Sequence, residues 1–227
     1  MKIGILMAGH FPRALQSKMG NYDALYTQLL SGNDFDFVTY PVVDDVFPED
    51  VHDCDGWLIS GSRHGAYEDL PFIERLMDFV RGAYAARVPI VGICFGHQVI
   101  AAALGGKVEK YSGGWAIGNT SYSWGDATYH LNAWHQDQVT EAPPVARVLA
   151  SNDFCQNAAL IYGDQAFSVQ AHPEFESDHV AGLAEVRAPG KVPQPLIEAA
   201  QSKLSAANDN AKLADMIAKF FKERRIA

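Results

Sequence analysis

The sequence predicts an α/β fold in which a mostly parallel central sheet is flanked by helices. Short apolar segments alternate with segments of helical spacing from the first residues to about Gly106, which is typical of a parallel sheet covered on both faces. From Lys107 onward the segments are shorter and rich in aromatic and β-branched residues, which favours antiparallel strands. The last part of the chain again has helical spacing, so we expect an additional antiparallel strand region and C-terminal helices.

The first part of the chain contains the elements expected to form the parallel sheet and its helices. Strands are predicted at residues 2–8, 35–43, 56–59 and 88–93, and helices at residues 21–30, 72–86 and 98–104. The helix over 72–86 is indicated by apolar side chains at helical spacing, which are Phe72, Ile73, Leu76, Phe79 and Val80. Because sites in parallel sheets form beyond the carboxyl ends of the strands, we expect the segment 60–62 and Cys94 to lie close together.

The second part of the chain is expected to contain antiparallel strands followed by helices. Strands are predicted at residues 108–111, 119–124, 129–134, 147–150, 158–162 and 166–170, the last two as a hairpin, and helices at residues 178–187, 195–205 and 211–224. The Pro-Gly-rich segment APGKVPQP at 188–195 separates a main domain, residues 1–187, from a helical extension, residues 188–227. Since about 30 residues are too few to fold alone, the extension is expected to pack on the same domain.

The composition limits the class of protein. The 227 residues are 48% hydrophobic and 11% aromatic, which is typical of a globular chain. The net charge of −9, without a basic stripe, argues against nucleic-acid binding. No apolar run approaches the roughly 18 residues of a membrane helix, and the start MKIGILMAGHF is interpreted as a strand, not a signal peptide. Three cysteines without a CxxC pair suit reduced thiols, which favours the cytoplasm.

The segment VPIVGICFGHQ at residues 88–98 carries the strongest chemical signal in the sequence. It runs from an apolar strand through a turn, with Gly92 and Gly96 on either side of Cys94, and then into a helix. A nucleophile on such a tight turn takes a strained backbone conformation, and neighbouring side chains would clash there. Peptide dipoles at the helix N-terminus would also stabilise a thiolate. The alternative is a buried core cysteine at the end of a strand.

His172 and Glu174 form a second candidate pair, directly after the last predicted strand. They are two residues apart on an extended chain, so their side chains leave on the same face, and Pro173 stiffens the segment between them. Glu174 could therefore orient the His172 ring and stabilise its charged form, as the base beside a cysteine nucleophile requires. The alternative is a surface histidine and glutamate in a strand-to-helix loop, with Glu174 near the helix start.

Together, GICFGHQ at residues 92–98 and HPE at residues 172–174 resemble the motifs of the class I glutamine amidotransferase family, of the Cys-His-Glu type. An upstream loop containing Ser-Gly and an HxDxV segment at residues 135–139 occur in the family's order. The resemblance spans about residues 2–175. It implies a flavodoxin-like, three-layer fold, with Cys94 as nucleophile, His172 as base and Glu174 as the residue that orients the base.

The same resemblance implies which groups surround the nucleophile. The backbone N–H groups of Phe95 and Ser62 would form the oxyanion hole. The glutamyl end of the substrate would be held by Gly61, Gln98, His135, Gln136 and Asp137. Many family members have glycine where this chain has Ser62, and the left-handed conformations that glycine allows are less favourable for serine.

The implied reaction is acyl transfer, for which neither a metal nor another cofactor is needed. Cys94 would attack the γ-carboxamide carbon of glutamine or of a γ-glutamyl compound, and the resulting thioester would be hydrolysed to glutamate. The residues that could be considered for a metal, His130, His135 and Asp137, match no reliable ligand spacing. Since glutamine and γ-glutamyl compounds are small, the expected substrate is a small molecule.

Three functions are compatible with these motifs. The first is a free-standing hydrolase, because the loop ISGSRHGAYED resembles γ-glutamyl peptide hydrolases. This loop precedes the tight strand-to-helix turn at Cys94, which we call the elbow. The second is a glutaminase subunit that supplies ammonia to a separate synthetase, because HxDxV resembles the amidotransferase half of GMP synthase and the chain has no GxxxxGK(S/T) loop. The third is a non-catalytic regulatory binding protein. In any of them, one of Trp115, Trp124 and Trp134 is expected to line the pocket, since the resemblance places this region beside the site.

Overall fold

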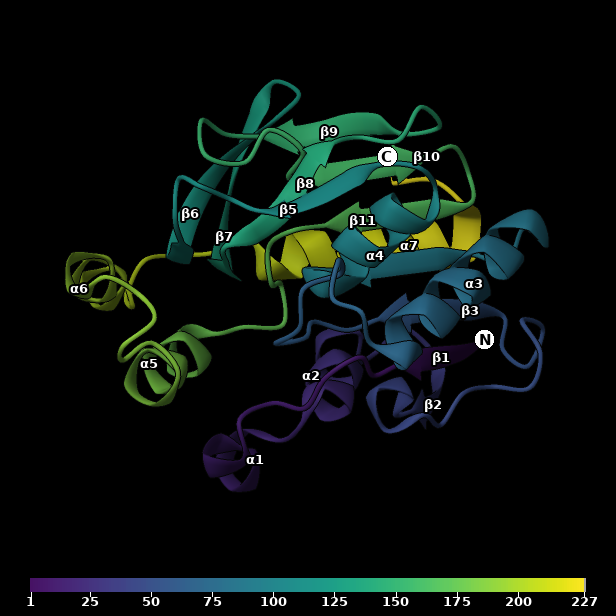
Figure 1. The fold of residues 1–227 in the computed structure, drawn as a ribbon, viewed down its shortest axis with the longest axis horizontal. Helices are drawn as coiled ribbons and strands as arrows, with labels where there is room; N and C mark the ends of the chain where they lie inside the picture. Colours follow the sequence, from purple (N-terminus) through teal and green to yellow (C-terminus); the bar gives the residue numbers. More distant parts are fainter. Residues whose placement is uncertain (227) are drawn as a thin grey trace.

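A nine-stranded mixed sheet runs through the middle of the molecule (Figure 1). The structure is a computed structural model that describes residues 1–226. In spatial order the strands are β2 (Asp36–Tyr40), β1 (Lys2–Leu6), β3 (Gly56–Ile59), β4 (Ile90–Ile93), β11 (Ala166–Val169), β10 (Ala159–Tyr162), β9 (Arg147–Ser151), β6 (Ala116–Trp124) and β7 (Ala127–His135). The five strands from β2 to β11 pair in parallel, and the remaining four continue the sheet as antiparallel pairs.

Helices cover both faces of this sheet, which confirms the predicted three-layer α/β fold. The helices α3 (Pro71–Ala85) and α4 (Phe95–Ala103) pack on one face, around a core that includes Trp57 and Ile59 of β3. The helices α1 (Arg13–Met19), α2 (Tyr22–Leu29) and α7 (Asn210–Glu223) pack on the other face, against Ile3 and Ile5 of β1. Figure 1 shows α7 and α4 on opposite sides of the sheet. The apolar alternation of β1 decides which side chain faces which layer.

The structure adds details that the sequence prediction did not contain. The antiparallel strands extend the parallel sheet, because β11 pairs with β4 on one side and with β10 on the other. A strand that was not expected, β8 (Asp137–Glu141), pairs with β5 (Lys107–Lys110) in a separate two-stranded sheet. The short helix α1 and the 3-10 turn Val42–Asp44 were also not expected. Both are too short to give a clear helical period in the sequence.

The C-terminal helices are α5 (Ser177–Val186), α6 (Gln194–Ser202) and α7. The apolar stripe of α7, made of Leu213, Ile217, Phe220 and Phe221, is buried in the same core as β1 and β4. Residues 188–226 therefore pack on the rest of the chain, whereas the domain boundary at residue 187 stays a prediction. Within residues 1–226, none of the helices has both the length and the apolar character that crossing a bilayer requires.

Candidate active site

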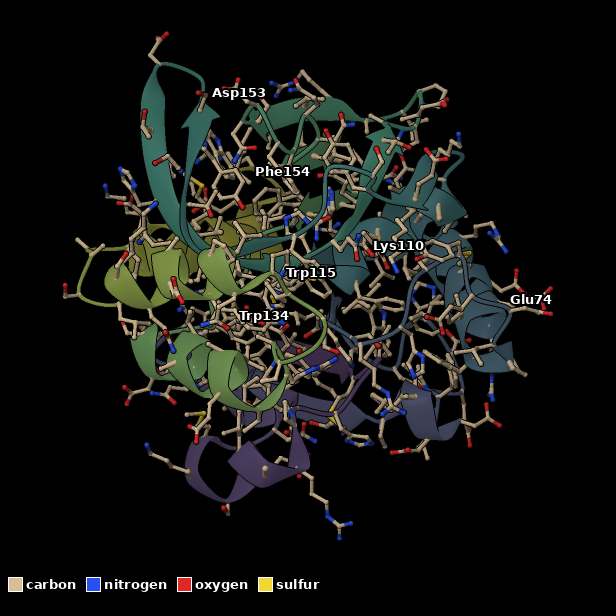
Figure 2. All side chains as sticks on the ribbon, turned by 60° about the vertical axis from the view of Figure 1, so that its left-hand side comes forward. Glu74, Lys110, Trp115, Trp134, Asp153 and Phe154 are labelled. Atoms are coloured by element: carbon tan, nitrogen blue, oxygen red, sulfur yellow. The ribbon has the colours of Figure 1, made fainter. Side chains whose placement is uncertain are left out.

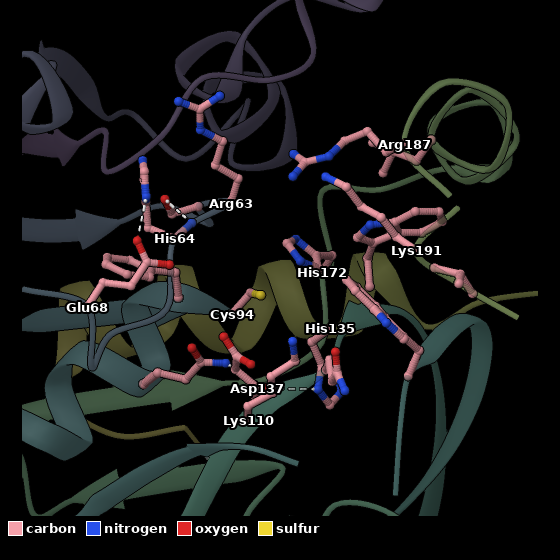
Figure 3. Close-up of a pocket in the computed structure, with 18 of the residues that line it drawn as sticks. Arg63, His64, Glu68, Cys94, Lys110, His135, Asp137, His172, Arg187 and Lys191 are labelled. Carbon is pink, nitrogen blue, oxygen red and sulfur yellow. Dashed lines mark hydrogen bonds and ion pairs between the residues drawn. The ribbon is translucent and has the colours of Figure 1, made fainter. Parts of the chain in front are cut away.

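Cys94 occupies the sharp turn between β4, which ends at Ile93, and α4, which begins at Phe95. Its backbone has φ 53° and ψ −101°, in a region that residues with a side chain rarely adopt. Such strain persists only where the surrounding structure imposes it, and it gathers at functional sites. Figure 3 shows the Cys94 sulfur directed into the pocket, on the side that faces His172. The predicted elbow is therefore present.

Glycines on either side of Cys94 are required because backbones approach closely there. A Cβ added to Gly92 would lie 2.5 Å from the carbonyl carbon of Gly96. A Cβ added to Gly96 would lie 2.3 Å from the carbonyl oxygen of Ile59, at the end of β3. The elbow is thus pressed against the strand that leads into the segment 60–62, which brings these two parts of the chain together as predicted.

His172 lies just beyond β11 and is fixed by contacts with three other segments. Its backbone N–H donates to the carbonyl of Asn132 in β7 at 2.8 Å. Its ring stacks on Phe175 with 4.1 Å between centroids and 2° between planes. On the opposite side, a Cβ added to Gly61 would lie 3.0 Å from Cε1 of His172. These contacts leave the buried ring little freedom to turn away from Cys94.

Glu174 stands behind His172, with both side chains almost completely buried. Nδ1 of His172 donates to Oε1 of Glu174 at 2.7 Å, and the Tyr26 hydroxyl donates to the same oxygen at 2.9 Å. The Tyr26 hydroxyl also accepts the backbone N–H of Gly61 at 3.2 Å. With the Nδ1 proton held by Glu174, the Nε2 atom is the one available for chemistry.

The protonation of His172 follows from its neighbours. Burial alone lowers the pKa of His172, but Cys94 and Glu174 outweigh burial and raise it to about 10. Both neighbours favour the imidazolium form of the ring. The resting arrangement is therefore a cationic His172 between the Cys94 sulfur and the Glu174 carboxyl group. Such a pair can supply a nucleophile and a proton donor.

A chain of amide groups also reaches the Cys94 sulfur. Nε2 of Gln170 donates to Sγ of Cys94 at 3.6 Å. Nε2 of Gln98 donates to Oε1 of Gln170 at 3.1 Å and to the Asp137 carbonyl at 2.8 Å. Both N–H groups of Gln98 are thus used inside the protein, and only its carbonyl oxygen remains for a substrate.

The two expected oxyanion-hole residues both line the pocket with Cys94. Phe95 is the first residue of α4, and the N–H groups of a helix's first turn have no partner within the helix. Ser62 follows β3, and its hydroxyl accepts the backbone N–H of His64 at 3.2 Å. Ser62 is not among the non-glycine residues with positive φ, so the serine at this position introduces no backbone strain.

The pocket at Cys94 has a volume of about 240 Å³. Of the residues predicted for the site, those that line it are Cys94, His172, Ser62, Phe95, Gln98, His135, Gln136 and Asp137. Gly61 and Glu174 lie behind it, packed against His172. Trp115 and Trp134 also line the pocket, and Figure 2 shows them close to the C-terminal helical region. Trp124 packs instead against Tyr129 and Phe167.

The other histidines near the site are neutral or paired. Burial, with a smaller contribution from the nearby His135, lowers the pKa of His97 to about 3, and His97 Nδ1 lies 2.8 Å from the Ser168 hydroxyl. Burial lowers the pKa of His135 to about 4. His64 pairs with Glu68 at 3.0 Å. In the part of the chain that the structure describes, no three His, Cys, Asp or Glu side chains gather as a metal site.

Two residues in direct contact with Cys94 or Glu174 were not identified from the sequence. Gln170 lies two residues before His172, so strand alternation places both on one face and could have indicated it. Tyr26 belongs to α2 and reaches Glu174 across 148 positions of the chain. No local pattern in the sequence signals that contact.

Comparisons with known proteins agree with this geometry. The family model for glutamine amidotransferase class-I matches residues 24–181. Gamma-glutamyl peptidase 4 of Arabidopsis thaliana is 30% identical over 223 residues, which cover 91% of this chain and 89% of that protein. The glutamine-hydrolyzing GMP synthase subunit of Methanopyrus kandleri is 32% identical, over 66% of this chain and 84% of that protein.

A solved structure shares the whole fold. The crystal structure of a glutamine amido transferase from Methylobacillus flagellatus aligns with a TM-score of 0.74, over 99% of this chain and 94% of that chain, at 19% identity. At this identity the likeness concerns the fold alone. The family model, however, matches more than half of the sequence, including the elbow and the His172–Glu174 pair. The chain therefore belongs to the class-I glutamine amidotransferase family.

Proposed function

We propose that this protein is a cysteine hydrolase that cleaves the γ-glutamyl amide bond of small γ-glutamyl compounds without a synthetase partner. The observation that carries the proposal is the buried His172 between Cys94 on a strained elbow and Glu174. A non-catalytic binding protein would have no need to maintain a strained cysteine beside a charged histidine. The near full-length similarity to a gamma-glutamyl peptidase supports the choice of a free-standing hydrolase.

The first half of the reaction forms a thioester. The Cys94 thiolate attacks the γ-carbonyl carbon, and the carbonyl oxygen becomes an oxyanion that accepts the N–H groups of Phe95 and Ser62. The C–N bond then breaks as His172 gives its Nε2 proton to the departing nitrogen. Ammonia or an amine leaves, and the γ-glutamyl group stays bound to Sγ.

The second half releases glutamate. Neutral His172 takes a proton from a water molecule, which attacks the thioester carbon, and the C–S bond breaks. The Cys94 thiolate and the cationic His172 are restored together. Glu174 keeps Nδ1 protonated in both halves, because its Oε1 accepts that hydrogen throughout.

The glutamyl end of the substrate has polar partners on the side of Cys94 away from His172. Glu68 and Asp137 line that side of the pocket, and the Gln98 side chain, which also lines the pocket, donates to the Asp137 carbonyl. A carboxylate such as Glu68 suits the α-ammonium group, and the carbonyl oxygen of Gln98 can accept from it. His135 and Gln136 complete the wall of the same proposed substrate site, and Gly61 supports it from behind through its contact with His172.

The second candidate function is an ammonia-supplying subunit for a separate synthetase. It is favoured by the similarity to the glutamine-hydrolyzing GMP synthase subunit, whose matched region covers 66% of this chain. That region is shorter than the region shared with the peptidase, which covers 91% of this chain.

The three cysteines are free and buried, which supports a reducing compartment such as the cytoplasm.

The test is to purify the protein alone and to measure glutamate released from glutamine, glutathione and simple γ-glutamyl amides. We expect turnover of at least one amide or peptide, and none with Cys94→Ala. Cys54→Ala is the matched control, because Cys54 is a buried thiol outside the pocket.

Two other outcomes would contradict the proposal. No turnover, with Cys94 still alkylated by a glutamine-like electrophile, would favour the ammonia-supplying subunit. No turnover and no alkylation would favour the regulatory binding protein.

A further inference from the structure

A second cavity, of about 530 Å³, adjoins the catalytic pocket. Four residues line both cavities, and they are Arg63, His64, Arg187 and Lys191. The remaining wall comes from residues 9–13, Gln16 and Val43. The second cavity has about twice the volume of the catalytic pocket. Ammonia released from glutamine would need no such space, so the cavity suggests a larger departing group.

The wall of this cavity is strongly cationic in a protein whose net charge is −9. Arg13, Arg63, Arg187 and Lys191 line it, and none of its lining residues is an aspartate or glutamate. Over residues 1–226, none of these four cations has a carboxylate within the 4.0 Å of an ion pair. Unpaired cations that converge on one cavity favour an anionic ligand.

The cations lie on the side of the site from which the leaving group departs. The departing nitrogen must be within reach of His172, which gives it a proton. Figure 3 shows Arg187 and Lys191 reaching toward the space beside His172, whereas Asp137 and Glu68 lie on the opposite side of Cys94. Arg187 is also close enough to Tyr22, inside the catalytic pocket, to oppose the rise in the pKa of that hydroxyl, which burial causes.

The segment that carries two of these cations is held in place. Arg187 is the C-cap of α5, where the last carbonyls of the helix favour a cation without neutralising it. Ala188 and Val192 are buried in a small cluster with Trp115 and Trp134. Lys191 therefore projects from a packed turn, and the aromatic wall of the catalytic pocket fixes the position of the cationic cavity.

We propose that the second cavity binds the amine part of the substrate and selects amines that carry a carboxylate, as in γ-glutamyl amino acids and γ-glutamyl peptides. The proposal rests on the γ-glutamyl hydrolase function proposed above. Arg187 and Lys191 contact the carboxylate of the departing group, and Arg63 extends the cationic wall for longer peptides. The contribution of these three residues is to substrate selection, since none of them touches the reacting bond.

The experiment compares substrates that differ only in this charge. γ-Glutamylglycine is paired with γ-glutamylglycinamide, and γ-glutamylalanylglycine is paired with its C-terminal amide. For each pair the ratio of kcat/KM, acid over amide, is measured for the unmodified protein. A ratio of about tenfold in at least one pair is expected for a partly exposed, charge-assisted contact.

Variants assign this preference to the cavity. Arg187→Gln and Lys191→Gln should each lower the ratio by about threefold, mainly through KM of the acid, and the double variant should bring it near one. Arg147→Gln is the matched control, because Arg147 is an exposed cation of β9 that lines neither cavity. Added salt should lower the ratio of the unmodified protein as well.

The outcomes separate this inference from the function on which it rests. Turnover in which the amides react as well as the acids in both pairs would overturn the inference and leave the hydrolase proposal intact. A preference for acids that Arg187→Gln, Lys191→Gln and the double variant leave unchanged would also overturn it. Absence of turnover for all four compounds, with glutathione or a simple γ-glutamyl amide still hydrolysed, would overturn the inference alone. Absence of turnover for these four and for every compound of the first test would remove the proposed function and the inference with it.

Discussion

At the level of single side chains, His172 owes its positive charge to two residues that lie on opposite sides of its ring. Cys94 lies on one side of the ring and Glu174 on the other, and both raise the pKa of His172 against the effect of burial. The Tyr26 hydroxyl donates to the same carboxylate oxygen that holds Nδ1. The proposed proton transfer to the departing amine therefore depends on Glu174 even though Glu174 does not touch the substrate.

Replacing Glu174 by glutamine should change the pH dependence of hydrolysis. Since the carboxylate helps to raise the pKa of His172 to about 10, its removal lowers that pKa. The imidazolium that protonates the leaving group is then lost at lower pH. The alkaline limb of kcat/KM should move to lower pH, with a fall in rate on the order of 10²-fold or more.

The measurement is a pH profile of kcat/KM for one γ-glutamyl peptide. Glu185→Gln is a suitable control, because Glu185 is an exposed carboxylate of α5 without an ion pair in the described chain, and it should leave the limb in place. An alkaline limb in Glu174→Gln that coincides with that of the unmodified protein would show that Glu174 does not set the charge of His172.

At the level of elements, the junction of β4 and α4 determines the geometry of the site. The strained turn at Cys94 is possible because Gly96 lets α4 approach the end of β3. The same contact positions the loop that carries Ser62. One close approach of backbones therefore aligns the nucleophile with both groups of the proposed oxyanion hole.

Gly96→Ala should disrupt this junction. The new methyl group would meet the carbonyl oxygen of Ile59 at 2.3 Å, and a backbone group cannot move aside as a flexible side chain can. We expect a loss of stability of about 1–3 kcal/mol and nearly complete loss of hydrolysis. Gly82→Ala is the control. Gly82 lies within α3, and the new methyl group would lie at an ordinary contact distance of 3.5 Å from Val51. This substitution should stabilise the helix by about 0.5–1 kcal/mol.

Urea unfolding and the hydrolysis assay test both variants. A Gly96→Ala protein with unchanged stability and activity would mean that α4 can shift away from β3 at no cost.

Local patterns in the sequence were enough to predict this junction. The strand before Cys94, the two glycines and the helix after them occur within 11 consecutive residues, 88–98, and the pair His172 and Glu174 is equally local. The predicted strand at Gly56–Ile59 also has the bounds found in the structure. Short-range geometry decides each of these features, so the sequence displays them directly.

Features that depend on distant contacts could not be predicted in this way. Tyr26 reaches Glu174 from a helix in the first part of the chain. The segment 188–195 was interpreted as a link beyond the main domain, yet Lys191 lies in it and lines both cavities. β8 was missed because its first residues were interpreted only as part of the HxDxV motif. In each case packing across the molecule decides the role.

At the level of the whole molecule, α7 joins the C-terminus to the core beneath the sheet. Phe221 is buried and contacts the start of β3, where a Cβ added to Gly56 would lie 2.8 Å from its ring. It also packs edge-to-face on Phe35, with 5.9 Å between centroids. The helix α7 thus covers the face of the sheet on which Ile3 and Ile5 of β1 lie, and it shares that core with β1 and β4.

Phe221→Ala should therefore destabilise the whole protein rather than release only its last helix. Removing a buried phenylalanine costs about 3–5 kcal/mol, and in a chain of this size each kcal/mol lowers Tm by about 2–4 °C. Calorimetry should show one cooperative transition at a Tm lower by roughly 6–20 °C. Asp215→Ala, on the exposed side of α7, is the control and should change stability by at most about 0.5 kcal/mol. A separate early transition of Phe221→Ala, with the main Tm unchanged, would contradict this expectation. It would mean that α7 can unfold while the core under the sheet stays intact, so that α7 is an independent appendage.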